Sequence, residues 1–369
     1  MATLCTQYFN VNLEEAGKLR LQKDYPEYIK SALKFIRAWQ NGRITFSLKT
    51  SGSTGAPKPF VLKRHVMKES AAMTALTFRL DHHATLLCCL SSDYIAGMMM
   101  IARALVLECN LVIMEPSGNP YKNMPCECGQ VTFAAFVPMQ MKEMLENDAA
   151  SKWLVSLGCI ILGGGEVPQE LMPAIKDINV PVYHTYGMTE TYTHIARRRL
   201  NGIGNSPEYV PFKGIVLGKD SRGCLTIWGR VTENKVLVTN DMVDLHTDQT
   251  FRWLGRWDNI INSGGIKIHP EEAELWIARA LEKAGYLDQK FIISGLPDPR
   301  LGQKVVLIIE GTSWSAHDID KVLKNLTEKL PRYHAPREIV FMDNLKITAS
   351  GKVDRKGTME LVKKITTVS

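Results

Sequence analysis

Short apolar runs alternate with amphipathic stretches along the middle of the chain. The apolar runs are short enough to be buried strands, and they lie at 85–90, 111–114, 131–137, 159–162 and 180–183. The stretches between them are amphipathic and predict helices at 94–108, 139–147 and 168–177. This strand–helix–strand order predicts an α/β fold built on a parallel, doubly wound sheet. Ligands of such sheets bind beyond the carboxyl ends of the strands, where the glycines 163–165 and the segment 184–191 fall.

The pattern changes after residue 205. Strand-like runs at 225–228, 235–238 and 251–254 predict a small antiparallel unit, and the polar, glycine-containing stretch 255–265 is interpreted as a hinge. Beyond it the pattern predicts a compact α+β domain, with helices at 271–284 and 317–329 and strands at 291–293, 305–309 and 338–342. We therefore expect a large N-terminal domain over 1–256 and a small, mobile C-terminal lid domain over 257–369.

Composition narrows the class of protein. With 369 residues, 45% of them apolar, the chain can bury a large core. The mean hydropathy is −0.10 and no apolar run approaches spanning length, so stable membrane association is not expected. The N-terminus lacks the pattern of a secretory signal, and the eight cysteines are scattered, which indicates a reducing, cytoplasmic location. Cys126 and Cys128 have no second thiol pair at zinc-ligand spacing, so a loop is favoured over a metal site there.

Charge adds little specificity. A net charge of +7 would suit polyanionic small molecules, but the basic residues are dispersed apart from Arg197–Arg199. No interleaving of aromatic and basic residues predicts a nucleic-acid surface. The arginine run is interpreted as a solvated cationic surface.

The segment 50–58, Thr-Ser-Gly-Ser-Thr-Gly-Ala-Pro-Lys, carries the strongest chemical signal. Exposed backbone N–H groups, hydroxyls and a lysine can together enclose an anion. Strand-like residues flank it at 43–49 and 60–62, but the spacing is not that of a Walker A loop, since Lys58 follows proline. A solvated turn is the alternative interpretation.

Three further segments each allow two interpretations. In 186–191, Glu190 could hold Mg²⁺, or the segment could be a strand-to-helix turn capped by Thr189. Asp241 and Arg256 could bind a ribose, or form a surface ion pair beside a hairpin. Lys352 would be a solvated tail residue unless its domain folds over a phosphate site.

Taken in order, the segments 50–58, 186–190, 255–258 and 350–352 resemble the signature motifs of the adenylate-forming superfamily of acyl-CoA synthetases, adenylation domains and luciferases. The resemblance covers nearly the whole chain from about residue 45. It implies an enzyme that joins an acid to ATP as an acyl-AMP and then transfers the acyl group to CoA, with Mg²⁺ as the cofactor. Small-molecule acid, ATP and CoA would be its partners, and a homo-oligomer is left open.

The resemblance also implies roles for individual positions. The β- and γ-phosphates of ATP would be held by Thr50, Ser51, Gly52, Ser53, Thr54, Gly55 and Lys58, and the adenine pocket would be lined by Gly164, Gly165, His184, Thr185 and Tyr186. Thr189 would contact the α-phosphate, Glu190 would hold Mg²⁺, and Asp241 and Arg256 would bind the ribose. Asp258 would be the hinge, Lys352 would catalyse the first half-reaction, and Gly264 and Gly265 would leave room for the thiol of CoA.

The chain departs from the superfamily in two ways. Fewer than fifty residues precede the phosphate loop, and Tyr94 stands before Gly97 where many relatives have histidine. Tyr94 would stack on an aromatic acid or pack into the core. Thr193 and His194 are the candidates for anchoring a second carboxylate of the acid.

Within the superfamily the chain is most similar to the o-succinylbenzoate–CoA ligases of menaquinone biosynthesis, on the stretches 136–140, 162–165 and 186–191. One alternative is acyl transfer to a carrier protein, but no fused carrier domain is visible. The other is a non-catalytic nucleotide sensor, which would have no need for Lys352 together with Glu190 and Asp241.

Overall fold

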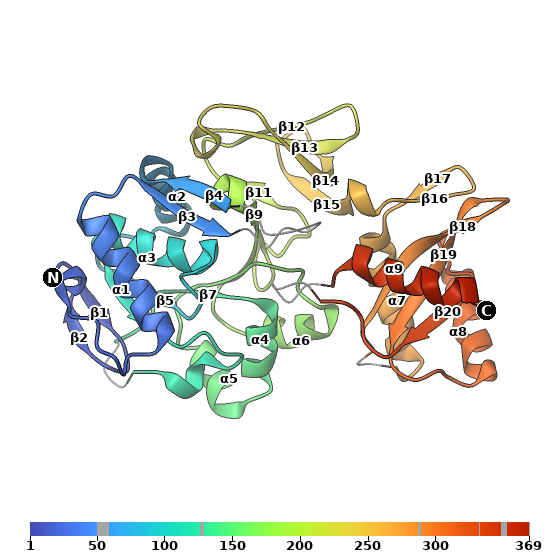
Figure 1. The fold of residues 1–369 in the computed structure, drawn as a ribbon, viewed down its shortest axis with the longest axis horizontal. Helices are drawn as coiled ribbons and strands as arrows, with labels where there is room; N and C mark the ends of the chain where they lie inside the picture. Colours follow the sequence, from blue (N-terminus) through green and yellow to red (C-terminus); the bar gives the residue numbers. More distant parts are fainter. Residues whose placement is uncertain (50–58, 126–128, 287–288, 332, 348–352, 369) are drawn as a thin grey trace.

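The computed structural model describes residues 1–49, 59–125, 129–286, 289–331, 333–347 and 353–368. Figure 1 shows a large body formed by the first two thirds of the chain and a smaller one formed by the C-terminal third.

A mixed sheet forms the centre of the large body. Within the described residues it has nine strands in the order β11-β10-β9-β8-β7-β5-β6-β1-β2. Their bounds are β1 Thr3–Cys5, β2 Asn10–Asn12, β5 Thr85–Cys88, β6 Asn110–Ile113, β7 Phe133–Phe136, β8 Ile160–Leu162, β9 Val182–Met188, β10 Thr193–Arg199 and β11 Val210–Pro211. The strands from β1 to β9 in this order run parallel, and β2, β10 and β11 are antiparallel at the edges. This confirms the predicted doubly wound sheet.

Helices cover both faces of this sheet. They are α1 Glu27–Gln40, α2 Arg64–Phe78, α3 Ile95–Leu107, α4 Pro138–Leu145, α5 Asp148–Leu154 and α6 Met172–Lys176. Alternate strand residues join different cores: Leu86 packs with the apolar side chains of α1 to α3, and Leu87 packs with those of α4 to α6. The continuous apolar runs in the sequence follow from this burial on both faces.

The structure contains elements that the sequence pattern did not predict, α2 and α5 among them. The sequence pattern predicted no element before residue 43. In the structure β1 pairs in parallel with β6, and the apolar side chains of α1 join the core on one face of the sheet. The segment after β9 is not a strand-to-helix turn. A single 3₁₀ turn over Thr189–Thr191 joins β9 to the antiparallel strand β10, because the chain reverses there instead of entering a helix.

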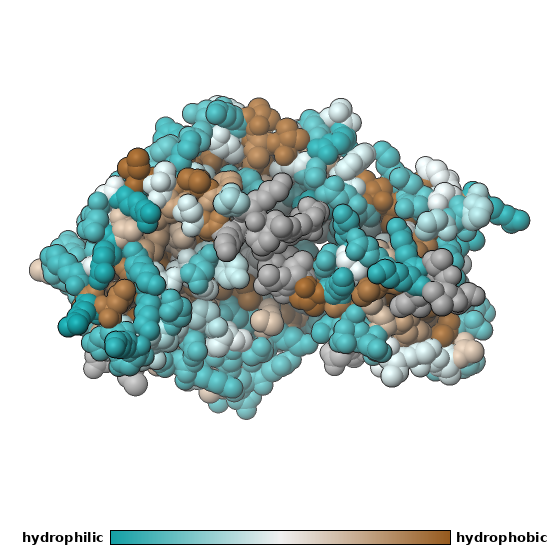
Figure 2. Space-filling model, viewed as in Figure 1, coloured by the Kyte–Doolittle hydropathy of each residue, from teal (hydrophilic) through white to brown (hydrophobic). Residues whose placement is uncertain are grey.

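Two antiparallel units complete the large body. Strands β3 (Thr45–Lys49) and β4 (Pro59–Lys63) pair along their full length. The predicted small antiparallel unit is confirmed as β12 Val216–Lys219, β13 Cys224–Trp228, β14 Leu237–Leu245 and β15 Phe251–Arg256, with β14 starting later and running further than expected. Figure 2 shows a mostly hydrophilic surface with an apolar patch over this unit. The exposed apolar side chains of the unit include those of Val216 and Val238.

The C-terminal body is α+β, as predicted. Its strands are β16 Ile261–Ser263, β17 Ile266–Ile268, β18 Phe291–Asp298, β19 Gly302–Glu310 and β20 Glu338–Met342, and its helices are α7 Pro270–Lys283, α8 Ala316–Lys329 and α9 Arg355–Val368. It has apolar cores of its own, with Ile277 and Leu307 in one and Val306 and Val362 in the other.

The arginine run 197–199 is not a solvated surface. Arg197 and Arg199 lie over the ring of Tyr183, and Arg198 lies over the ring of Tyr209. All three side chains are half-buried, because these aromatic rings cover part of each guanidinium.

The described cysteines are free, and most are buried, as expected of small core residues. Cys126 and Cys128 lie outside the described residues. Among the helices that the structure describes, none is both long and apolar enough to cross a membrane.

Candidate active site

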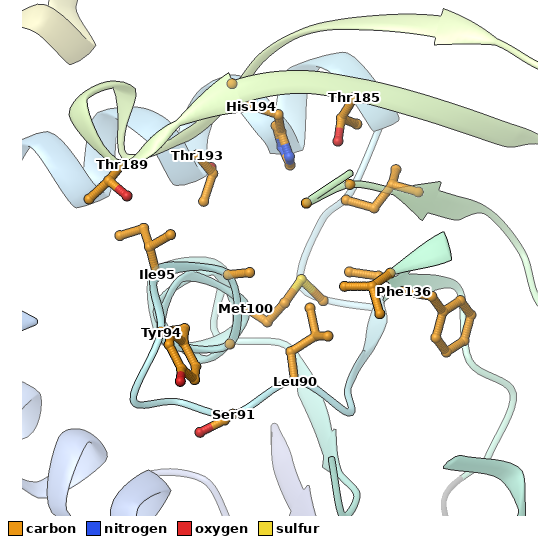
Figure 3. A pocket seen from close by; sticks show the side chains of 18 of the residues that line it. Leu90, Ser91, Tyr94, Ile95, Met100, Phe136, Thr185, Thr189, Thr193 and His194 are labelled. Carbon is orange, nitrogen blue, oxygen red and sulfur yellow. The ribbon is translucent and has the colours of Figure 1, made fainter. Parts of the chain in front are cut away.

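A cavity of about 440 Å³ opens at the carboxyl ends of the parallel strands (Figure 3). Leu90 follows β5, Val137 follows β7 and Gly163 follows β8, and all three line it. This is the edge of the sheet where the strand order predicted a ligand site. The expected site residues in its wall are Tyr94, Gly97, Gly164, Thr185, Thr189, Thr193 and His194.

Tyr94 and Gly97 form the part of the wall at the start of α3. Tyr94 is 48% exposed, which excludes the interpretation that it packs into the core. A Cβ atom at Gly97 would lie 2.3 Å from the carbonyl oxygen of Ser91. Glycine is therefore required where α3 approaches the chain leaving β5.

Arg103 lies in the opposite, buried part of the wall, and the sequence analysis missed it. It is 2% exposed, and burial lowers its pKa to about 9. Its Nε donates to Thr74 Oγ1 at 3.1 Å, and its Nη2 donates to Thr193 Oγ1 at 2.7 Å. Nη1 donates to the sulfur of Met100 at 3.4 Å.

No carboxylate pairs with Arg103 in the part of the chain that the structure describes. Buried charges are costly unless they are paired. The guanidinium thus offers positive charge and unused N–H groups to a ligand in the cavity. A signal was present in the sequence, because Arg103 is the one charged residue in the apolar stretch 95–107.

His194 lies beside this guanidinium. Its Nε2 is 2.9 Å from Thr74 Oγ1 and 3.4 Å from Arg103 Nη2. Burial and the neighbouring arginine hold the pKa of His194 well below its usual range. The imidazole is therefore neutral and adds no second positive charge. Among the described residues that line the cavity, the positive charge comes from Arg103.

The glycine turn after β8 forms the wall on the other side of the cavity. Gly164 has a φ of +80°, which favours glycine, and Thr185 Oγ1 donates to the carbonyl oxygen of Leu162 at 3.0 Å. His184 is buried behind the turn, with Nε2 at 2.9 Å from the carbonyl oxygen of Gly165. Burial and the neighbouring Arg198 lower the pKa of His184 to about 3.

Tyr186, Asp241, Arg256 and Asp258 are brought together, although they come from distant parts of the sequence. The Tyr186 hydroxyl donates to Asp241 Oδ2 at 2.6 Å, and Asp241 Oδ1 lies 3.6 Å from Arg256 Nη1. The other end of Arg256 pairs with Asp258 at 2.9 Å. Burial and the Asp241 carboxylate raise the pKa of Tyr186 well above its usual range, so the tyrosine remains a donor.

Glu190 is exposed and follows Thr189, which lines the cavity. No group of three metal-binding side chains exists among the residues that can be described. A single accessible carboxylate fits Mg²⁺ that arrives with a nucleotide, since this ion takes most of its ligands from phosphates and water.

The predicted phosphate-loop residues Thr50, Ser51, Gly52, Ser53, Thr54, Gly55 and Lys58 lie outside the described residues, as does Lys352. The ends of both segments are described. Lys49 pairs with Pro59 across the β3–β4 ladder, and Ile347 bridges to Val353.

Gly264 and Gly265 connect β16 to β17 as a two-residue hairpin turn, between the paired residues Ser263 and Ile266. Their φ angles are +59° and +81°, which such a turn requires and which favour glycine. The turn therefore accounts for both glycines in this structure, and the thiol passage remains a prediction.

Comparisons with known proteins add to this geometry. Residues 17–214 match the family model described as AMP-binding enzyme. The 2-succinylbenzoate–CoA ligase of Bacillus cereus is 25% identical over 344 residues, which are 86% of this chain and 70% of that protein.

Two solved structures share the fold. An acyl-CoA synthetase (AMP-forming)/AMP-acid ligase II-like protein from Dyadobacter fermentans is 36% identical, with a TM-score of 0.62 over 94% of this chain and 97% of that one. The o-succinylbenzoate coenzyme A synthetase from Bacillus subtilis, in complex with ATP and magnesium ion, is 21% identical, with a TM-score of 0.67 over 85% of this chain and 69% of that one.

Proposed function

Because the chain belongs to the AMP-binding enzyme family, we propose that it is an ATP-dependent, AMP-forming acid–CoA ligase whose acid substrate carries a second carboxylate. The observation that carries the proposal is the buried Arg103 in the cavity wall, which no carboxylate of the described residues pairs with. The favoured acid is 2-succinylbenzoate, the substrate in the name of the Bacillus cereus relative. The chain would then act in menaquinone biosynthesis.

The cavity suits an acid that carries two carboxylates on an apolar framework. Leu90, Ile95 and Met100 supply the apolar part of the wall. Arg103 donates to Thr193 in the buried part of the wall, and Figure 3 shows Thr193 beside Thr189, which we assign to the nucleotide. One carboxylate would pair with Arg103, and the other would meet the α-phosphate beside Thr189.

The first step joins two anions. A carboxylate oxygen of the acid attacks the α-phosphorus of ATP, the bond to the β-phosphate breaks, and pyrophosphate leaves. Positive charge and donors must offset the repulsion, and we assign this to Lys352, to Lys58 and its loop, and to Thr189. Mg²⁺ held by Glu190 would neutralise phosphate charge.

We assign the adenine and the ribose of ATP to two neighbouring groups of residues. The adenine would lie along Gly163–Gly165, and Asp241 would accept the ribose hydroxyls while Arg256 donates to them. Tyr186 already satisfies one oxygen of Asp241, which leaves Oδ1 toward Arg256 and the ligand.

The second step transfers the acyl group to CoA. The CoA thiolate attacks the acyl carbon and AMP leaves with the oxygen that joined it to the acyl group. We propose that the domain 257–369 turns about Asp258 on the domain 1–256 between the steps. Helix α9 begins beside the hinge: Glu271 is 4.0 Å from Arg355 Nε and packs against the backbone of Gly255 in β15. Lys352 precedes Arg355 by three residues in the sequence.

The test is acid-dependent ATP–pyrophosphate exchange with two probes, 2-succinylbenzoate and 3-benzoylpropionate, which lacks the benzoate carboxylate. The Arg103→Met variant should lower kcat/KM for the diacid about 30-fold, as expected for a lost charge-assisted hydrogen bond, and leave the monoacid nearly unchanged. Equal loss with both acids would contradict the role of Arg103.

Adding CoA separates the remaining alternatives. A CoA thioester as product supports the ligase. Exchange without a CoA thioester would indicate transfer to a carrier protein, and no exchange with any acid would indicate a nucleotide sensor.

A further inference from the structure

A chain of hydrogen bonds runs from the arginine run to the glycine turn. Arg198 on β10 directs two N–H groups at Nδ1 of His184, from Nε at 3.3 Å and from Nη2 at 3.1 Å. His184 Nε2 lies 2.9 Å from the carbonyl oxygen of Gly165. Arg198 also reaches Glu166, the residue after the turn, at 3.4 Å.

The donors and acceptors in this chain fix the proton of the imidazole. A guanidinium has only N–H donors, so Nδ1 of His184 must accept. Because the pKa of His184 is lowered to about 3, the ring is neutral and carries its one proton on Nε2. From Nε2 the ring can donate to the Gly165 carbonyl.

Tyr209 cannot fix the proton in the same way. Its hydroxyl is 2.8 Å from Nδ1 of His184, but a hydroxyl either donates or accepts. It is therefore compatible with both neutral forms of the ring. In the other form, Nε2 would face the Gly165 carbonyl with a lone pair, and two acceptors would repel each other.

We propose that Arg198 is a positioning residue for the nucleotide: by holding His184 in its Nε2–H form, it anchors the Gly165 carbonyl behind the turn and so presents Gly163 and Gly164 to the cavity. These two glycines line the cavity wall, whereas Gly165 and His184 do not. The inference rests on the proposed function only in assigning this turn to the adenine.

The experiment compares three variants of the full chain. Arg198→Met removes the donors to Nδ1, and Arg198→Lys retains a cation that has only donors. Arg197→Met is the matched control: Arg197 is the neighbouring arginine on β10, but it donates to the Thr77 carbonyl and lies over the rings of Phe78 and Tyr183, and its described hydrogen bond does not involve His184.

Two measurements are made on each variant. The affinity for ATP is measured by calorimetry and as KM in the exchange assay, beside KM for the acid. The ring proton is located by long-range ¹H–¹⁵N correlation on protein labelled with ¹⁵N-histidine, and the His184 signal is assigned by its loss in His184→Asn.

We expect the Nε2–H form in the unsubstituted protein. Arg198→Met should weaken ATP binding about tenfold with KM for the acid nearly unchanged, Arg198→Lys should recover most of the loss, and Arg197→Met should match the parent protein. An Nδ1–H form in the parent protein, an unchanged ATP affinity in Arg198→Met, or an equal loss in Arg197→Met would each overturn the inference.

If the proposed ligase function is wrong, the parent protein should show no acid-dependent ATP–pyrophosphate exchange. ATP binding should still weaken in Arg198→Met, and the inference about Arg198 would then stand.

Discussion

The Tyr186 hydroxyl donates to Asp241 Oδ2 at 2.6 Å across 55 positions of sequence. Tyr186 lies on β9 of the central sheet and Asp241 on β14 of the small antiparallel unit, so this bond joins two sheets of the large body at the proposed nucleoside site. Both side chains are buried, which makes the bond strong and its loss costly.

Replacing Tyr186 by phenylalanine should destabilise the protein by about 1–3 kcal/mol, because Asp241 would keep a buried carboxylate oxygen without its donor. If Asp241 binds the ribose, KM for ATP should also rise several-fold. Denaturant unfolding and the exchange assay measure the two effects. Tyr121→Phe, which removes a hydroxyl far from this pair, is the control, and an equal loss there would contradict the prediction.

Replacing Lys352 by alanine should separate the two half-reactions. Formation of acyl-AMP should be nearly abolished, because the lysine offsets the repulsion between carboxylate and α-phosphate. Thioester formation from supplied acyl-AMP and CoA should be largely retained. Equal damage to both half-reactions would argue against a single site that is reorganised by domain rotation.

Replacing Gly255 by alanine should loosen the contact between α7 and β15. The new Cβ would lie 2.3 Å from Glu271 Oε2, and the φ of +137° is unfavourable for any residue with a side chain. We expect a loss of about 1–3 kcal/mol in unfolding free energy. The double variant Gly255→Ala with Glu271→Ala should recover the steric part, and no recovery would show that the backbone conformation alone sets the cost.

Acid should destabilise the protein through His184. Its folded pKa is about 3 against 6.5 in the unfolded chain, so the unfolded state binds more protons between these values. The contribution of neutral His184 to the free energy of unfolding is complete above pH 6.5. It is lost as the pH falls toward 3, by at most about 1.4 kcal/mol per pH unit. His194, whose pKa is also lowered, acts in the same direction.

Denaturant unfolding between pH 7 and pH 4.5 measures this effect. The His184→Asn variant should show a shallower loss of stability on acidification than the parent protein. His82→Asn, at an exposed position, is the control and should follow the parent curve. Parallel curves for His184→Asn and the parent protein would show that His184 does not cause the loss of stability in acid.

The sequence predicted the parallel core because strands buried on both faces leave continuous apolar runs, as at Leu86 and Leu87. It did not predict β1, whose three residues become a strand by pairing with β2 and with the distant β6. The reversal at Thr189–Thr191 was missed because hydroxyl and carboxylate residues occur both in helix starts and in hairpin turns.

The site was predicted unevenly for a related reason. Motifs indicated Thr189, Asp241 and Arg256, since their residue types and spacing carry chemistry by themselves. Arg103 and Arg198 derive their roles from neighbours on other elements: Thr74 and Thr193 surround Arg103, and His184 meets Arg198. Such roles depend on tertiary contacts that single-sequence patterns do not contain.

The strand β1 also constrains how the chain matures on the ribosome. The backbone N–H of Thr3 donates to the side chain of Asn110, 107 residues further along, and Leu4 is fully buried there. β1 can pair with β2 early, but more than a hundred residues must be synthesised before it meets β6. Until then its apolar side chains are incompletely covered, so a nascent chain stalled before β6 would be a natural client for a chaperone.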